Sequence, residues 1–171
     1  ICTNFEPVIG ETYELTIVLN GQTYAATETF IGVSNLEDTI DQDNEGGFGG
    51  DEVELTYYYQ DDGFQDNYYL HSVMSPRVAF PEYELADDEN SQGNRIPETY
   101  SHEDLKPGDI VNIRLYGISK RYYQYFTKLL LASGNDDSPF ATTPTAVRGN
   151  IVNQTDNNNF PFGYFRLSEI S

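Results

Sequence analysis

Alternating apolar and polar positions predict β-strands along much of the chain. Residues 13–19 and 22–30 are two such runs, and Asn20-Gly21 between them is the strongest short signal for a hairpin. In the run 53–59, every second residue is apolar or aromatic, which is typical of a strand with one buried face. Further strands are expected over residues 67–74, 110–116 and 162–167.

One segment has the periodicity of a helix. Ser119 has the side chain of a good N-cap, and Gly134 suits the position just after a helix, so we expect a helix over about 119–133. Its apolar residues recur at the spacing i, i+3, i+4, i+7 and i+8. They are Tyr122, Tyr125, Phe126, Leu129 and Leu130. We interpret this face as core packing.

Two segments lack such periodicity. Residues 34–52 are rich in Asp, Glu, Asn and Gly and indicate an acidic loop insertion. Residues 75–109 hold four prolines and are expected to be a long irregular segment. Strands joined by hairpins and long loops, with one helix, predict a mainly β, antiparallel β-sandwich-like domain. We expect residues 1–171 to form a single domain with that helix packed on it.

The charge is large and unevenly distributed. The net charge is −19, and residues 1–76 contain no Lys or Arg, so this stretch alone carries −15. Such a surface repels phosphate backbones and anionic lipids, which argues against a nucleic-acid or direct membrane partner. The chain also has 14 Tyr and 10 Phe but no Trp, a composition that suits thin β-layers better than a thick helical core.

The acidic segment contains the sharpest motif of the sequence. Residues 41–52 match the register of an EF-hand loop, with acids at positions 1, 3 and 5, Gly at 6 and Glu at 12. The candidate calcium ligands are therefore Asp41, Asp43, Glu45 and Glu52. The flanks are strand-like, however, so an exposed acidic loop without a metal is the competing interpretation. No other cofactor is indicated.

Catalytic motifs are missing from the sequence. Cys2 is the sole cysteine, and neither His71 nor His102 has the spacing of a zinc ligand. There is no Gly-x-Ser-x-Gly motif, and we interpret His71 as structural. We therefore predict that the protein is not an enzyme. Runs of neighbouring tyrosines place one ring outward in each case, and the candidate binding-surface aromatics are Tyr58, Tyr68 and Tyr123.

A series of short motifs follows one another in a fixed order over nearly the whole chain. They are Gly10-Glu11-Thr12-Tyr13, Gly21-Gln22-Thr23-Tyr24, Asp66-Asn67-Tyr68-Tyr69-Leu70, Asp88-Glu89-Asn90 through Gly93-Asn94, Gly108-Asp109-Ile110-Val111, Tyr122-Tyr123-Gln124-Tyr125, Pro139-Phe140, Gly149-Asn150-Ile151 and Phe162-Gly163-Tyr164-Phe165. The order of these motifs resembles the DUF4249 family of Bacteroidota outer-membrane lipoproteins.

This resemblance implies a C-terminal portion of a longer lipoprotein, whose signal, lipidated cysteine and first β-domain lie upstream. It also implies a cell-surface, lipid-anchored location and a TonB-dependent β-barrel receptor as partner, in a role like that of SusD-type lids in nutrient capture. The alternative is a carbohydrate-binding β-sandwich with a structural calcium ion. Asp38-Thr39-Ile40 also resembles an O-glycosylation site of such proteins at Thr39, or is an ordinary loop tripeptide.

Overall fold

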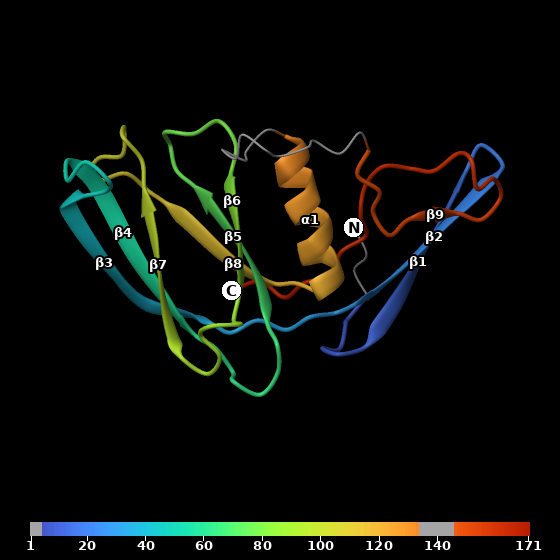
Figure 1. The fold of residues 1–171 in the computed structure, drawn as a ribbon, viewed down its shortest axis with the longest axis horizontal. Helices are drawn as coiled ribbons and strands as arrows, with labels where there is room; N and C mark the ends of the chain where they lie inside the picture. Colours follow the sequence, from blue (N-terminus) through green and yellow to red (C-terminus); the bar gives the residue numbers. More distant parts are fainter. Residues whose placement is uncertain (1–4, 134–145) are drawn as a thin grey trace. The chain divides into compact units, whose positions relative to one another are not determined.

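The computed structural model describes residues 5–133 and 146–171, and over these it is mainly antiparallel β-structure with one helix, as the sequence pattern predicts (Figure 1). The chain divides into two compact units. We call residues 33–117 with 170–171 the sandwich unit, and residues 1–32 with 118–169 the helix unit. Each unit is described by itself.

The sandwich unit consists of two three-stranded antiparallel sheets (Figure 1). The first has the order β3-β4-β7 and the second the order β6-β5-β8, so β4 and β5 are the central strands. The strands are β3 (Leu36–Gly46), β4 (Glu52–Gln60), β5 (Tyr68–Met74), β6 (Glu82–Asp87), β7 (Arg95–Ser101) and β8 (Asn112–Gly117).

Side chains from both sheets form the core of the sandwich unit. Tyr59 and Tyr69 meet edge to face with ring centroids 4.9 Å apart and pack with Leu115, which is fully buried. A second buried cluster contains Val53, Val73, Tyr100 and Leu105. The buried positions of β4 alternate, which confirms the predicted inward face of residues 53–59.

Two segments expected to be irregular contain strands. Most of the acidic segment 34–52 is β3, and the segment 75–109 contains β6 and β7. All three lie at sheet edges, where an exposed strand keeps polar residues and lacks a clear apolar run. Pro97 lies within β7, opposite Tyr58 of β4. An edge strand tolerates a proline because the backbone N–H groups on its outer side have no ladder partner, so the N–H that proline lacks is not needed there.

The helix unit contains a sheet of order β1-β2-β9, formed by β1 (Thr12–Leu19), β2 (Gln22–Thr29) and β9 (Val152–Asn153). Asn20 and Gly21 have φ of 51° and 74°, so the predicted hairpin is confirmed with a left-handed turn. The strand predicted over 162–167 is wrong. The backbone N–H and C=O of Phe165 instead bond the side-chain amide of buried Asn150, so this side chain takes the place of a neighbouring strand.

The helix α1 (Lys120–Ala132) begins where the sequence predicts it. The Ser119 hydroxyl accepts the N–H of Tyr122 at 3.1 Å and donates to the buried carboxylate of Glu28 at 3.1 Å. Tyr122 is buried and packs edge to face on Tyr164 at 5.0 Å. The predicted cap at Gly134 lies outside the described residues. In the ranges 5–133 and 146–171, no helix is long and apolar enough to cross a bilayer.

Candidate functional site

A pocket of about 260 Å³ lies between β6 and β7 in the sandwich unit, on one side of its core. Four strands, β4 to β7, contribute its lining. Buried side chains form its inner wall, whereas β6 contributes exposed ones at its rim. The residues with recognition chemistry are Tyr57, His71, Tyr83 and Tyr100, with the carboxylates of Glu82 and Glu84.

Strand register explains why these residues meet. His71 of β5 lies directly opposite Glu84 of β6, and Tyr57 of β4 lies directly opposite Glu98 of β7. Residues directly opposite each other in an antiparallel pair project from the same face. Tyr57 Oη lies 3.0 Å from His71 Nδ1, so the two central strands are joined across the core at this point. The two glutamates flank that contact from the outer strands.

His71 is buried, with 2% of its surface exposed. Burial lowers the pKa of its imidazole to about 4, because the charged form would lose its hydration. The ring is therefore neutral near pH 7. Among the residues the structure describes, its Nε2 atom has no hydrogen-bond partner and is shielded from solvent. One ring nitrogen at the wall of the pocket is thus unsatisfied.

The carboxylates around the pocket are not neutralised. Over the described part of the chain, none of Glu82, Glu84 and Glu98 has an ion-pair partner. Glu82 accepts a hydrogen bond from the Tyr100 hydroxyl at 2.7 Å. Burial, and then the charge of Glu84, raises the pKa of Glu98. Burial and the charges of Glu98 and Glu84 also raise the pKa of Tyr57, which stays protonated.

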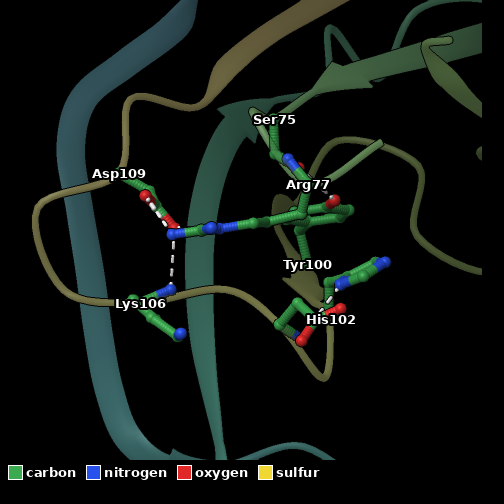
Figure 2. A network of polar contacts seen from close by, with 7 residues as sticks. Ser75, Arg77, Tyr100, His102, Lys106 and Asp109 are labelled. Carbon is green, nitrogen blue, oxygen red and sulfur yellow. Dashed lines mark hydrogen bonds and ion pairs between the residues drawn. The ribbon is translucent and has the colours of Figure 1, made fainter. Parts of the chain in front are cut away.

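A polar network fixes the loops beside Tyr100 (Figure 2). The Tyr100 hydroxyl lies 3.2 Å from Ser75 Oγ, which accepts the backbone N–H of Arg77 at 3.3 Å. The Arg77 guanidinium binds both oxygens of Asp109 at 2.7 Å, and one of these oxygens also accepts the N–H of Lys106 (Figure 2). Arg77 is therefore neutralised by Asp109, whose pKa the guanidinium lowers, and is not a counterion of the pocket.

The predicted calcium ligands occupy a hairpin and do not surround a common centre. Asp41, Asp43 and Glu45 lie along β3, and Glu52 begins β4. In a strand, alternate side chains lie roughly 7 Å apart on one face, whereas an EF-hand loop wraps its ligands around the ion. Within the described ranges, no group of three or more His, Cys, Asp or Glu side chains is placed to hold a metal ion.

The other residues singled out from the sequence do not line the pocket. Tyr58 is half-buried, donates to Asp41 Oδ2 at 2.7 Å and carries the Arg95 guanidinium 3.6 Å above its ring, so one ring face is already covered. Tyr68 and Tyr123 are half-buried in β5 and α1. Thr39 is exposed in β3. None of these three tyrosines lines the pocket.

Sequence reasoning missed the tyrosines that do line the pocket. The signal that could have found them is the alternation Glu82-Tyr83-Glu84-Leu85, together with Ile96, Glu98 and Tyr100 in the next run. Each pattern marks a half-buried strand, and each was obscured by the neighbouring prolines.

One family model matches the chain. Its description is "Domain of unknown function (DUF4249)", and it covers residues 1–171. No curated protein and no solved structure matches the chain.

Proposed function

Since the chain belongs to the DUF4249 family, we propose that it is a non-catalytic, lipid-anchored binding module of the bacterial cell surface. Its role in this proposal is that of an accessory subunit of a TonB-dependent outer-membrane transporter, where it captures a nutrient. The observation that carries the proposal is the pocket between β6 and β7, which presents recognition groups without a reactive pair.

The chemistry of the pocket supports binding over turnover. The one hydrogen bond of the His71 ring goes to Tyr57, and no serine, threonine or cysteine among the described residues bonds to it as a nucleophile. The pKa of Tyr57 is raised and that of His71 is lowered, so proton transfer from the phenol to the ring is unfavourable near pH 7. Tyrosine rings and hydrogen-bonding side chains are, in contrast, common in binding sites.

The pocket size supports a small ligand. A volume of about 260 Å³ is just below the range of roughly 300–1,000 Å³ for small-molecule sites. It therefore suits one small nutrient molecule or one side chain of a peptide. The family resemblance supplies the transporter, because such lipoproteins are expected to pair with a β-barrel receptor that takes up what they capture.

Co-purification from native membranes tests the transporter role. The full-length lipoprotein, tagged at its C-terminus, is extracted in mild detergent, and the eluate is analysed by size exclusion and mass spectrometry. We expect a β-barrel receptor at near-equal stoichiometry that stays bound in high salt. An unrelated surface lipoprotein with the same tag and expression level is the matched control.

Two kinds of result would contradict the proposal. A monomer without a stoichiometric barrel, or a barrel that the control lipoprotein recovers equally, contradicts the accessory role. Turnover of a polysaccharide or peptide library that is lost in Tyr57→Phe contradicts the proposal that the protein is not an enzyme.

A further inference from the structure

We infer that the pocket between β6 and β7 binds a primary ammonium group, carried by a small amine or by a lysine side chain. This inference rests on the proposed function in so far as both treat the pocket as a binding site, and it adds the chemical class of the ligand. Three independent features of the pocket carry it: its charge, its aromatic lining and its unsatisfied imidazole nitrogen.

The first feature is unbalanced negative charge. Glu82 and Glu84 line the pocket, Glu98 lies next to it, and no lysine or arginine contributes to the lining. Both arginines with strong ion pairs in this unit are already satisfied by Asp109 and Glu37. Burial, and after it charge repulsion from Glu84, raises the pKa of half-buried Glu98, so a cation that entered the pocket would relieve that repulsion. An anionic ligand would increase it.

The second feature is the aromatic lining. Tyr57 and Tyr100, which are buried, line the same pocket as the carboxylates, and Tyr83 lies between Glu82 and Glu84 in β6 with its side chain on the other face of the strand. An ammonium group is attracted to the electron-rich face of an aromatic ring, and aromatic cages are a recurrent means of binding amines. The same unit already uses this interaction, because the Arg95 guanidinium lies 3.6 Å above the ring of Tyr58.

The third feature is the Nε2 atom of His71, which is buried and without a partner among the described residues. When Nδ1 carries the proton and donates it to Tyr57 Oη, Nε2 is left as a lone-pair acceptor. An ammonium group has three donors and no acceptor, so it matches the carboxylates at the rim, and Nε2 is an acceptor without a partner just behind the wall that shields it from solvent. Val73 in the lining provides an apolar contact for the methylene groups of an aminoalkyl chain.

NMR titration of the ¹⁵N-labelled 171-residue chain tests the inference. The probes are N-acetyl-lysine methyl ester for a lysine side chain and cadaverine for a free amine. The matched uncharged probe is N-acetyl-norleucine methyl ester. We expect saturable shifts at Tyr57, His71 and Glu84 with at least one amine, and weaker binding at high salt. The probe that binds more tightly identifies the source of the ammonium group.

Two charge-removing variants provide the comparison. Glu84→Gln should weaken amine binding about tenfold, because it removes a carboxylate from the rim. Glu89→Gln removes the same charge from an exposed position outside the pocket and should leave the affinity unchanged. The spectrum of each variant without ligand shows whether the fold is kept, and Glu84→Ser replaces Glu84→Gln if it is not.

Equal binding of the norleucine ester, equal affinity of both variants, or shifts confined to residues outside the pocket would overturn the inference. Failure of the inference is distinguishable from failure of the proposed function. A neutral sugar or a carboxylate that shifts Tyr57 and His71 instead would overturn the ammonium assignment while supporting a binding module. Loss of the receptor in co-purification would not alter the titration.

Discussion

A hydrogen bond between Tyr57 and His71 joins β4 to β5, with 3.0 Å between Oη and Nδ1. Both side chains are buried, and their rings lie 5.8 Å apart between centroids. A polar pair inside an apolar core costs little when it is bonded and much when it is broken. The contact therefore holds the side chains of Tyr57 and His71 in place in the wall of the pocket.

Tyr57→Phe should destabilise the chain by about 1–3 kcal/mol, because it leaves Nδ1 of His71 buried without a partner. Tyr58→Phe in the same strand is the matched control and should cost well under 1 kcal/mol, since its hydroxyl bonds an exposed aspartate. Urea unfolding followed by fluorescence measures both. Equal losses would show that the Tyr57–His71 bond contributes nothing specific.

The neutral state of His71 makes stability depend on pH. Its pKa is about 4 in the folded chain and about 6.5 when unfolded, so the unfolded state binds the proton more tightly. The contribution of the neutral His71 ring to the free energy of unfolding is fully present above about pH 6.5 and is lost as the pH falls toward 4. We expect a loss of about 2 kcal/mol from this group between about pH 7 and pH 5.

The many carboxylates titrate over part of the same range, so the His71 contribution is isolated by difference. His71→Gln should flatten the pH dependence of the unfolding free energy by that amount. The imidazole resonances provide a direct check. A His71 imidazole resonance that titrates near pH 6.5 would show that burial does not hold the ring neutral.

How far the sequence predicts this structure depends on where a strand lies in its sheet. The central strands β4 and β5 have buried alternate positions, and the sequence predicts both to within a residue or two. The edge strand β3 carries mostly exposed polar residues, so its pattern is that of an acidic loop. The pocket was missed for the same reason, because Glu84 reaches His71 only through the pairing of β6 with β5.

The turn at residues 61–63 shows another limit of sequence reasoning. The Asp-Asp-Gly pattern predicts the turn, but not that Asp61 is buried. Its carboxylate accepts the Tyr69 hydroxyl at 2.5 Å and the N–H groups of Gly63 and Gly93 at 3.1 and 2.7 Å. The contact with Gly93 spans 32 residues, and a local pattern carries no information about it.

Gly149→Ala should disrupt the helix unit. A Cβ at this position would collide with the carbonyl oxygen of Gly163, and this is backbone that cannot rotate away. Gly10→Ala is the comparison, because Gly10 has open space around it but a φ of 86°, so it should cost only about 1–2 kcal/mol. Thermal unfolding by circular dichroism measures both. A smaller loss for Gly149→Ala than for Gly10→Ala would contradict the close approach.

Calcium should stabilise the chain no more than magnesium does. The acids at 41, 43 and 45 follow a strand and do not converge, so any effect of a divalent cation should come from general screening of the acidic surface. Melting temperatures in CaCl₂ and MgCl₂ at equal ionic strength test this. A calcium-specific increase that Asp43→Asn abolishes would contradict this expectation and restore the calcium interpretation.

The start of α1 should depend on a buried carboxylate far away in sequence. Glu28 Oε2 accepts hydrogen bonds from Ser119 Oγ at 3.1 Å and from the Tyr164 hydroxyl at 2.6 Å, and Ser119 Oγ also caps the helix. Ser119→Ala should cost about 1–2 kcal/mol, because it removes the cap and one donor to Glu28. Tyr164→Phe removes the other donor. Burial, and after it the bond to Glu28, raises the pKa of the Tyr164 hydroxyl.

Because both donors satisfy the same oxygen, the two changes should not be additive. The double variant leaves buried Glu28 Oε2 without either donor, so its loss should exceed the sum of the single losses by about 0.5–3 kcal/mol. Thr127→Ala serves as the control partner, since its hydroxyl donates to the helix carbonyl of Tyr123. A cycle of Ser119→Ala with Thr127→Ala should be additive. Additivity in both cycles would mean that Glu28 does not couple the helix start to Tyr164.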